Sequence, residues 1–201
     1  MELIEAATIM HYHRHRISEF GEDTVKALGW KNKESQQKRY EVLAGIADLN
    51  HSSVLDPGCG YADLKYYLDQ HFEQVTYIGI DQQPEFVKSA AERYKRDSNA
   101  HFYLGDFSKV NWPEVDYVLA SGALGYHSKN EEFYHNMIIK MFGAAKKGVA
   151  FNMLDDRHFG EHPLLRAHDR SKVLAWCQKL SKNVDCVDGY LPEDFTIYLH
   201  K

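Results

Sequence analysis

The sequence predicts an α/β fold: a Rossmann-like three-layer sandwich with a mostly parallel seven-stranded sheet and an antiparallel pair at its C-terminal edge. Two observations carry this prediction. From residue 53 onward, strand-like apolar runs alternate with segments of helical periodicity, which is typical of right-handed βαβ units and a parallel sheet. The tail instead holds two strand-like runs joined by "GYLPE", which indicates an antiparallel pair.

The elements follow in a simple order. The first 50 residues have helical patterns in "LIEAATIMHYHRHRISEF", with a weak apolar period through Ile4 and Ala7, and in "ESQQKRYEVLAGIADL". Between them, "GEDTVKALGW" predicts a turn and a short helix that ends at Gly29. The predicted parallel strands are "SVLD", "VTYIGID", "AHFYLGD", "VDYVLAS" and "KGVAFNML". Helical apolar stripes separate them, except at "FSKVNWPE", where Pro113 interrupts a short connection.

Composition limits the class of protein. The chain has 201 residues, of which 44% are hydrophobic and 26% charged, so one structural domain with a buried core is expected. The net charge of -5 opposes binding to nucleic acid over the whole surface. No apolar run approaches the roughly 20 residues that span a bilayer, so no membrane partner is expected. Cys59, Cys177 and Cys186 lack CxxC spacing, which predicts reduced thiols and a cytoplasmic location.

The stretch "VLDPGCGYADL", residues 54–64, places two glycines at the carboxyl end of the first predicted strand. Ligands of open α/β sheets bind beyond such ends. We expect Gly58 and Gly60 to give the backbone freedom and to let main-chain N–H groups approach a ligand. Asp81 ends the second strand, 21 residues after Gly60, and an acid at about that distance commonly bonds ribose hydroxyls. The pattern therefore predicts a ligand that contains a ribose.

The acids of this stretch favour one class of ligand. A dinucleotide places its pyrophosphate at the positive N-terminus of the helix after the loop. Asp63 stands in that first turn and Asp56 just before the glycines, and two carboxylates would repel a pyrophosphate. They suit a cation, such as the phosphate-free nucleoside S-adenosylmethionine, with its sulfonium and ammonium groups. A nicotinamide cofactor is the alternative.

Four motifs resemble those of class I S-adenosylmethionine-dependent methyltransferases. "VLDPGCGYADL" is similar to their motif I, "YIGIDQQPEFVKSA" to motif II, "FYLGDF" to motif III and "VDYVLASGALGY" to motif IV. The resemblance covers about residues 40 to 155. Ala62 stands where the family often has glycine. The loop after the fourth strand lacks the (N/D)PPY sequence of enzymes that methylate amino groups of DNA and protein.

The resemblance implies a role for each matching residue. The backbone around Gly58, Cys59 and Gly60 would meet the methionine part of the cofactor, and Asp56 would support the loop and the amino group. Asp81 would hold the ribose, with Gln82 or Gln83 touching the adenosine. The remaining cofactor-binding residues would be Asp106 and Phe107 at the adenine, and Ser121 and Gly122 beside the methyl group.

The candidate residues that would contact the methyl acceptor lie in loops and in the N-terminal segment. Tyr126 and His127 follow the fourth strand and are the candidate catalytic residues, because histidine can take a proton near neutrality. A solvent-facing loop histidine is the alternative. The family places variable N-terminal helices over the donor, so the resemblance implies a helical lid at residues 1–50 over a core at 51–201. Tyr12, Arg16 and Trp30 of this lid are the candidate substrate contacts.

Charge and histidine patterns in the lid leave two interpretations open. Residues 11–40 hold seven Lys or Arg against four Asp or Glu, which is compatible with an anionic substrate or with a solvated helix face. His11, His13 and His15 are spaced by two. On a helix His13 would point away from the other two, so no metal site is predicted.

These observations predict a methyltransferase that acts on a small molecule by in-line transfer from S-adenosylmethionine, with S-adenosylhomocysteine as product. The chain has almost no insertions, which favours a compact acceptor, and the protein would be a monomer or a homodimer. The motifs also look like those of methyltransferases for small carboxylic acids, such as trans-aconitate. The alternatives are a catalytically silent cofactor-binding partner protein, an RNA or tRNA methyltransferase, and a non-methyl reaction of the same cofactor.

Overall fold

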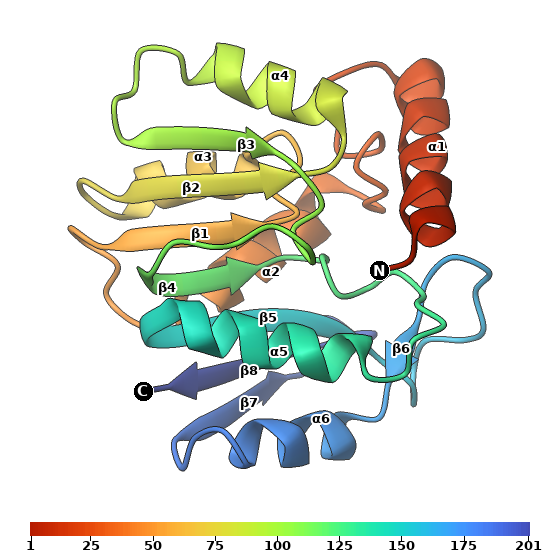
Figure 1. Cartoon of the computed structure of the whole chain (residues 1–201), viewed down its shortest axis with the longest axis vertical. Helices are drawn as coiled ribbons and strands as arrows, with labels where there is room; N and C mark the ends of the chain where they lie inside the picture. Colours follow the sequence, from red (N-terminus) through yellow and green to blue (C-terminus); the bar gives the residue numbers. More distant parts are fainter.

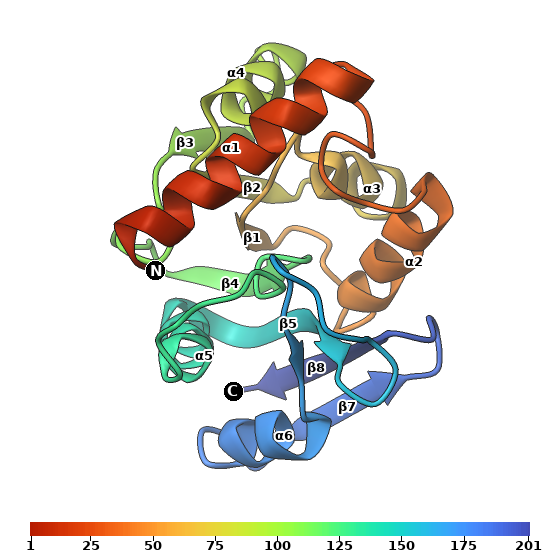
Figure 2. The same ribbon diagram turned by 90° about the vertical axis from the view of Figure 1, so that its right-hand side faces the viewer.

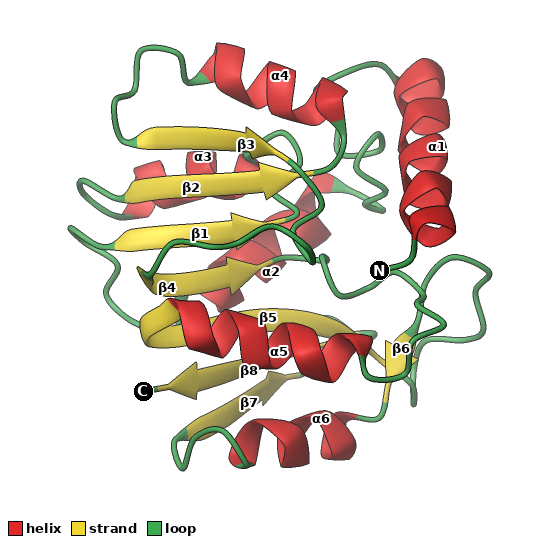
Figure 3. Ribbon diagram, in the orientation of Figure 1, coloured by secondary structure: helices red, strands yellow, loops and turns green.

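One mixed sheet runs through the molecule, with helices on both of its faces (Figures 1 and 3). The computed structural model describes all residues from 1 to 201. The strands are β1 (Ser53–Pro57), β2 (Thr76–Asp81), β3 (Ala100–Leu104), β4 (Val115–Ala120), β5 (Ala145–Asp155), β6 (Ala167–His168), β7 (Val184–Asp188) and β8 (Asp194–His200). The helices are α1 (Leu3–Phe20), α2 (Lys33–Ala44), α3 (Asp63–His71), α4 (Pro84–Arg93), α5 (Phe133–Ala144) and α6 (Arg170–Gln178).

The strand order is β3-β2-β1-β4-β5-β8-β7, and the short strand β6 pairs with β5 beside this path. Strands β3, β2, β1, β4 and β5 are parallel to one another, while β8 is antiparallel to both β5 and β7. The predicted mostly parallel seven-stranded sheet with an antiparallel C-terminal pair is confirmed. The additional β6 was not predicted. The order reverses between β1 and β4, which is where open α/β sheets bind ligands.

Each face of the sheet has its own hydrophobic core. Helices α2, α3 and α4 share one core with β1 and β2, built around residues such as Leu43, Leu64 and Val54. Helices α5 and α6 share the other, in which Met141 packs with Phe151 and Ile197. Parallel strands covered on both faces read as continuous apolar runs, which is why the sequence located them well. None of the helices is both long and apolar enough to cross a bilayer.

The N-terminal 50 residues divide between two places. Helix α1 crosses in front of the carboxyl ends of β1 to β4 (Figure 2), whereas α2 packs in the helical layer through buried Tyr40 and Leu43. Of the lid expected at residues 1–50, α1 therefore lies across the strand ends, whereas α2 belongs to the helical layer. The short helix expected in "GEDTVKALGW" is a series of turns. Ile4 was expected on the apolar face of α1, but it is 75% exposed. The buried face of this helix is formed instead by Ala6, Ile9 and His13.

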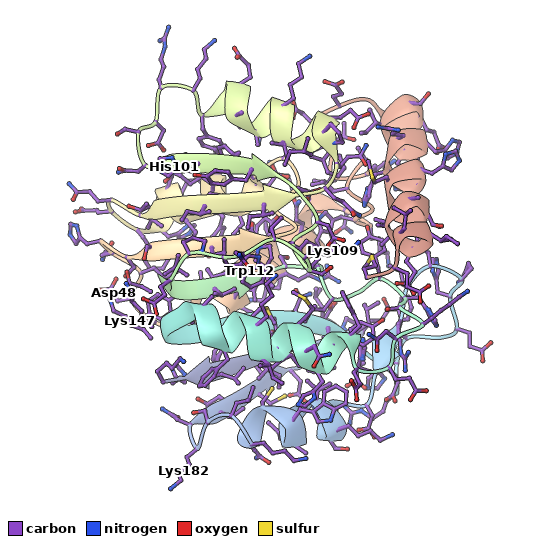
Figure 4. All side chains as sticks on the ribbon, in the orientation of Figure 1. Asp48, His101, Lys109, Trp112, Lys147 and Lys182 are labelled. Atoms are coloured by element: carbon purple, nitrogen blue, oxygen red, sulfur yellow. The ribbon has the colours of Figure 1, made fainter.

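The connection from β3 to β4 contains no helix, as the sequence predicted. It is held instead by Lys140 of α5, whose Nζ donates to the carbonyl oxygens of Phe107, Ser108 and Val110 at 2.8, 3.1 and 2.7 Å. The same ammonium lies 4.6 Å from the ring centroid of Trp112, which packs against the core that contains α5; Figure 4 labels Trp112 among the side chains of the molecule. This contact places Asp106 and Phe107 at the carboxyl end of the sheet.

Candidate active site

A cavity of about 690 Å³ opens at the carboxyl ends of the parallel strands. Helix α1 and residues 28–32 cover one side of it, and the loop from β7 to β8 covers another. The predicted site residues that line the cavity are Tyr12, Trp30, Asp56, Gly58, Cys59, Gly60, Asp81, Gln82, Asp106, Phe107, Ser121, Gly122 and Tyr126. Segments far apart in the sequence are thus brought to one place.

The glycine loop offers space to a ligand. Gly58 and Gly60 have positive φ angles of 82° and 54°. A Cβ on Gly58 would lie 3.1 Å from Ala123 Cβ, and one on Gly60 would lie 2.6 Å from Leu28 Cδ2. Cys59 between them turns its thiol into the core, where a Cβ on Gly79 would lie 2.8 Å from its Sγ. Cys59 therefore faces the cavity with its main chain.

The amides of this loop are already engaged inside the protein. Gly58 N and Cys59 N donate to Ile80 O at 2.7 and 3.2 Å, and Gly60 N donates to Asp81 Oδ2 at 2.9 Å. The expectation that these N–H groups face a ligand was wrong. Amides that are bonded within the protein cannot cradle a pyrophosphate, so the loop does not have the donors of a dinucleotide site.

Asp63 has a different role from the one its position suggested. It does not line the cavity. Its Oδ1 accepts from Arg93 Nη1 at 2.9 Å and its Oδ2 from Gln36 Nε2 at 3.1 Å. Asp63 therefore ties α2 and α4 to α3 and lies outside the cavity. The engaged amides of residues 58–60, and not Asp63, leave no free N–H group at this loop for a phosphate.

Two buried carboxylates lie under the glycine loop. Asp56 is 2% exposed. Its Oδ2 accepts from Tyr77 Oη at 2.5 Å, while its Oδ1 is buried without a partner. Burial raises the pKa of Asp56 to about 7, and the Coulomb interaction with Asp81 adds to this. Burial also raises the pKa of Asp81, although the amides of Gln83 and Gly60 bond its carboxylate. A cationic ligand would relieve this accumulation of negative charge.

Two further polar groups line the same cavity. Asp106 Oδ1 accepts from Ser108 N and Oγ at 2.9 and 2.6 Å, and its buried Oδ2 forms an ion pair with Lys109, whose Nζ lies 3.2 Å away. Burial opposes ionisation of Asp106, but these contacts lower its pKa overall. Ser121 Oγ is buried and unpaired. Buried polar groups normally have partners, so Asp56 Oδ1 and Ser121 Oγ indicate a ligand with hydrogen-bonding groups.

A chain of polar contacts shapes the opposite side of the cavity. Arg39 Nε and Nη2 bond the two carboxylate oxygens of Asp194 at 3.0 and 2.5 Å. Asp194 Oδ1 also accepts from Asn152 Nδ2 at 3.3 Å, and Asn152 Oδ1 accepts from Gly122 N at 2.9 Å. Trp30 joins this chain, since the Arg39 guanidinium lies 4.7 Å from its ring centroid. The chain fixes the loop after β4 relative to α2 and β8.

The structure separates the two candidate catalytic residues. Tyr126 lines the cavity and its Oη lies 2.6 Å from His13 Nε2. His127 is exposed, lies outside the cavity, and donates its amide to Leu164 O at 2.8 Å. His127 is therefore not placed to act as a general base, because its side chain lies on the solvent side of the loop.

The N-terminal basic residues are mostly engaged away from the cavity. Arg16 Nε donates to Lys26 O, and its guanidinium lies 4.8 Å from the ring centroid of Phe20, so the structure does not place Arg16 at the substrate. Carboxylates outnumber cationic side chains among the cavity-lining residues: Glu34, Asp56, Asp81, Asp106, Glu193 and Asp194 against Lys31, Lys38 and Arg39. The side chains that line the cavity are therefore acidic on balance.

The sequence reasoning missed His13 as a site residue. His11 and His15 are exposed and His13 is buried, which confirms the helical orientation expected for the three histidines. No group of three or more His, Cys, Asp or Glu side chains is placed to hold a metal ion. The available signal was the spacing of His13 four residues after Ile9 and seven after Ala6, which puts all three on one helix face.

Comparison with known proteins gives consistent results. The family described as "Methyltransferase domain" matches residues 48–191. The Mycobacterium tuberculosis protein named "Putative methyltransferase Rv1506c" is 32% identical over an alignment of 158 residues that covers 74% of this chain and 93% of the relative. Magnesium protoporphyrin IX methyltransferase from Synechocystis PCC 6803, solved with bound S-adenosylmethionine, aligns with a TM-score of 0.70 and 17% identity over 100% of this chain and 98% of that chain. The DhpI complex with S-adenosylhomocysteine aligns with a TM-score of 0.73 and 15% identity over 98% and 97%.

Proposed function

Because the chain belongs to the methyltransferase domain family, we propose that it transfers a methyl group from S-adenosylmethionine to a small-molecule acceptor. The observation that carries this proposal is the pair of buried carboxylates, Asp56 and Asp81, under a glycine loop whose amides are already bonded. This arrangement suits a nucleoside with positive charge and no phosphate. When bound, the cofactor would supply an electrophilic methyl group on a sulfonium.

The polar atoms of the cavity fit the donor groups of this cofactor. Asp56 Oδ1 would accept from the ammonium of the methionine part. The Asp106 carboxylate, which keeps lone pairs beside its contacts with Ser108 and Lys109, would accept from the exocyclic amine of adenine. The Asp81 carboxylate accepts two amides and retains lone pairs for the ribose hydroxyls. Phe107 would lie against the adenine, with Gln82 beside the adenosine. These roles are those implied by the sequence motifs.

In such a reaction the protein aligns the methyl donor with the acceptor and excludes water. Ser121 and Gly122 would lie beside the methyl group, in a loop fixed by the bond from Gly122 N to Asn152. Trp30 packs so closely over Gly122 that a Cβ there would lie 2.7 Å from its ring. The lid residues thus bury the position from which the methyl group would leave.

A small acceptor is favoured over a polymer. The cavity lies under α1 and is lined by more carboxylates than cationic groups, which opposes RNA as the substrate. The name of one structural neighbour specifies a porphyrin, a small molecule, as its substrate. We propose a neutral or weakly charged acceptor. It replaces the anionic acceptor with which the basic N-terminal segment was compatible.

Calorimetry with S-adenosylmethionine, S-adenosylhomocysteine and NAD tests the proposal directly. We expect the first two to bind and NAD to show no heat. Asp81→Ala should weaken binding by about 1–3 kcal/mol, the value of a hydrogen bond to a charged group, while the exposed Glu92→Ala serves as a matched control. S-Adenosylhomocysteine should form with members of an acceptor panel. Binding without any turnover would favour a silent cofactor-binding protein, and NAD binding alone would overturn the proposal.

A further inference from the structure

Two side chains that line the cavity form a hydrogen-bonded pair across the lid. His13 of α1 and Tyr126 of the loop after β4 are 113 residues apart in sequence, and His13 Nε2 lies 2.6 Å from Tyr126 Oη. His13 Nδ1 lies 3.0 Å from the carbonyl oxygen of Ala27. Both residues line the cavity in which the methyl acceptor would bind.

The partners determine where the hydrogens lie. A carbonyl oxygen only accepts, so His13 Nδ1 carries the hydrogen and donates it to Ala27. The neutral ring then has a lone pair on Nε2, and Tyr126 Oη must donate to it. Turning the phenol hydrogen toward a ligand would leave a buried ring nitrogen unpaired, which is unfavourable. The lone pairs of Tyr126 Oη are thus the part of this group that a ligand can reach.

The surroundings keep this arrangement neutral. His13 is 7% exposed and packs edge-to-face against Phe86, Tyr12 and Tyr126, with centroid distances of 5.0, 5.2 and 5.7 Å. Burial, with a smaller contribution from Arg16, lowers the pKa of His13 to about 4. Burial raises the pKa of the Tyr126 phenol, and the charged groups that act on it are Asp81 and Arg16 besides Tyr12.

We propose that His13 is a positioning residue that fixes the Tyr126 hydroxyl as a hydrogen-bond acceptor, and that the methyl acceptor therefore reacts through a protonated nucleophile, a hydroxyl or an amine. This inference rests on the proposed function. It excludes a carboxylate as the methylated group, since a carboxylate has no hydrogen to give to Tyr126.

The pair also provides a place for the proton. As the new bond from the nucleophile to the methyl carbon forms, the carbon–sulfur bond breaks and its electron pair remains on sulfur. The proton of the nucleophile passes to Tyr126 Oη while the phenol proton passes to His13 Nε2. The imidazolium loses this proton before the next turnover, and the lowered pKa of His13 favours that loss.

Nitrogen NMR of the imidazole rings tests the geometry without any substrate. With ¹⁵N-labelled protein saturated with S-adenosylhomocysteine, the signals absent from His13→Gln identify His13. We expect the neutral tautomer with hydrogen on Nδ1, unchanged from pH 6 to 8, and the same tautomer in the His11→Gln control. A hydrogen on Nε2, or a ring that becomes charged in this range, would overturn the proposal even if no acceptor were yet known.

Turnover gives the second test. On a panel of alcohols, phenols, amines and simple carboxylates, S-adenosylhomocysteine should form only with the first three classes. Tyr126→Phe and His13→Gln should lower kcat about a hundredfold with little change in cofactor affinity. Their kcat should rise with pH, whereas that of the wild type and His11→Gln stays flat between pH 6 and 8. Turnover of carboxylates, or variants with a flat profile, would contradict the pair while leaving the methyltransferase proposal intact. Failure of the protein to bind the cofactor would instead contradict the methyltransferase proposal.

Discussion

The two halves of the cavity are built in different ways. The donor half, which contains Asp56, Gly58, Gly60, Asp81 and Asp106, is made of residues at or just beyond the carboxyl ends of parallel strands and is joined largely through main-chain hydrogen bonds. The acceptor half is joined by side chains across long stretches of sequence: 113 residues separate His13 from Tyr126 and 155 separate Arg39 from Asp194.

This difference has a functional meaning. A donor half built from strand ends is fixed by the sheet itself, so it can hold the same cofactor in many related chains. An acceptor half built from individual side chains can change with few substitutions, and it sets the identity of the acceptor. Variants in the donor half should therefore lose cofactor binding, whereas variants in the acceptor half should lose stability or turnover.

Gly58→Val should abolish cofactor binding. The φ of 82° is unfavourable for any side chain, and a Cβ would already lie 3.1 Å from Ala123 Cβ, so valine would fill the space beside the loop. Calorimetry should detect no binding of S-adenosylhomocysteine, and circular dichroism should show a folded protein. Gly143→Val is the matched control, since a Cβ there meets nothing within 4 Å. Normal affinity in Gly58→Val would show that the loop does not contact the cofactor.

Arg39→Ala tests whether side chains hold the acceptor half together. It leaves the Asp194 carboxylate, which is 2% exposed, without its cation. Removing one partner of a buried pair typically costs about 3–5 kcal/mol, so chemical denaturation should show a loss of stability of that size. Lys38→Ala should cost less than about 1 kcal/mol, because its pair with Glu41 is solvent-exposed. Equal effects of the two substitutions would contradict this description of the acceptor half.

The donor half was predictable because its signals are local. Strand runs, glycines and the acids at strand ends occupy fixed offsets in the sequence, and parallel strands bring their carboxyl ends together. One neighbour was nevertheless misinterpreted. Asp63 lies within the same motif, but its position at the start of α3 turns it toward Arg93 and away from the cavity.

The acceptor half could not be predicted to the same extent. No local signal in the sequence pairs His13 with Tyr126, because that contact depends on where α1 crosses the sheet. His127 was a candidate beside Tyr126 because the two are adjacent, yet adjacent loop residues point in different directions. The basic residues of segment 11–40 were compatible with an anionic substrate, and only the β8 position of Asp194 shows that the charge of Arg39 is already paired.

Asp56→Asn separates binding from stability in the donor half. The carboxylate should attract the ammonium of the cofactor only when ionised, so wild-type affinity should increase as the pH rises through about 7. The asparagine variant should bind about 2 kcal/mol more weakly at pH 8, the value of a hydrogen bond to a charge, and should lose most of this pH dependence. Calorimetry at pH 6 and pH 8 provides both measurements. An affinity that does not respond to pH would mean that Asp56 does not meet a cation.

The same substitution should stabilise the protein without ligand. Because the folded pKa of Asp56 is raised above its ordinary value of 3.8 to about 7, wild-type stability is fullest below the unfolded value and declines as the pH rises toward the folded one. An asparagine cannot ionise and avoids this decline. Urea denaturation at pH 5 and pH 8 should show a smaller decrease for Asp56→Asn than for the wild type. A parallel pH dependence of the two proteins would refute this origin of the instability.

Ala62→Gly should produce the smallest effect and thereby mark the edge of the donor half. Ala62 adopts φ 60° and ψ 38°, a left-handed conformation that costs a residue with a Cβ about 1–2 kcal/mol. Glycine would remove that strain but would lose the packing of one buried methyl, about 0.8 kcal/mol, and would add freedom to the unfolded chain, about 0.4–1 kcal/mol. These terms nearly cancel, so the free energy of unfolding should change by less than about 1 kcal/mol. Cofactor affinity should change less than about twofold, since Ala62 does not line the cavity. A larger loss of affinity would extend the donor half to the third glycine position of the motif, only four residues from Gly58.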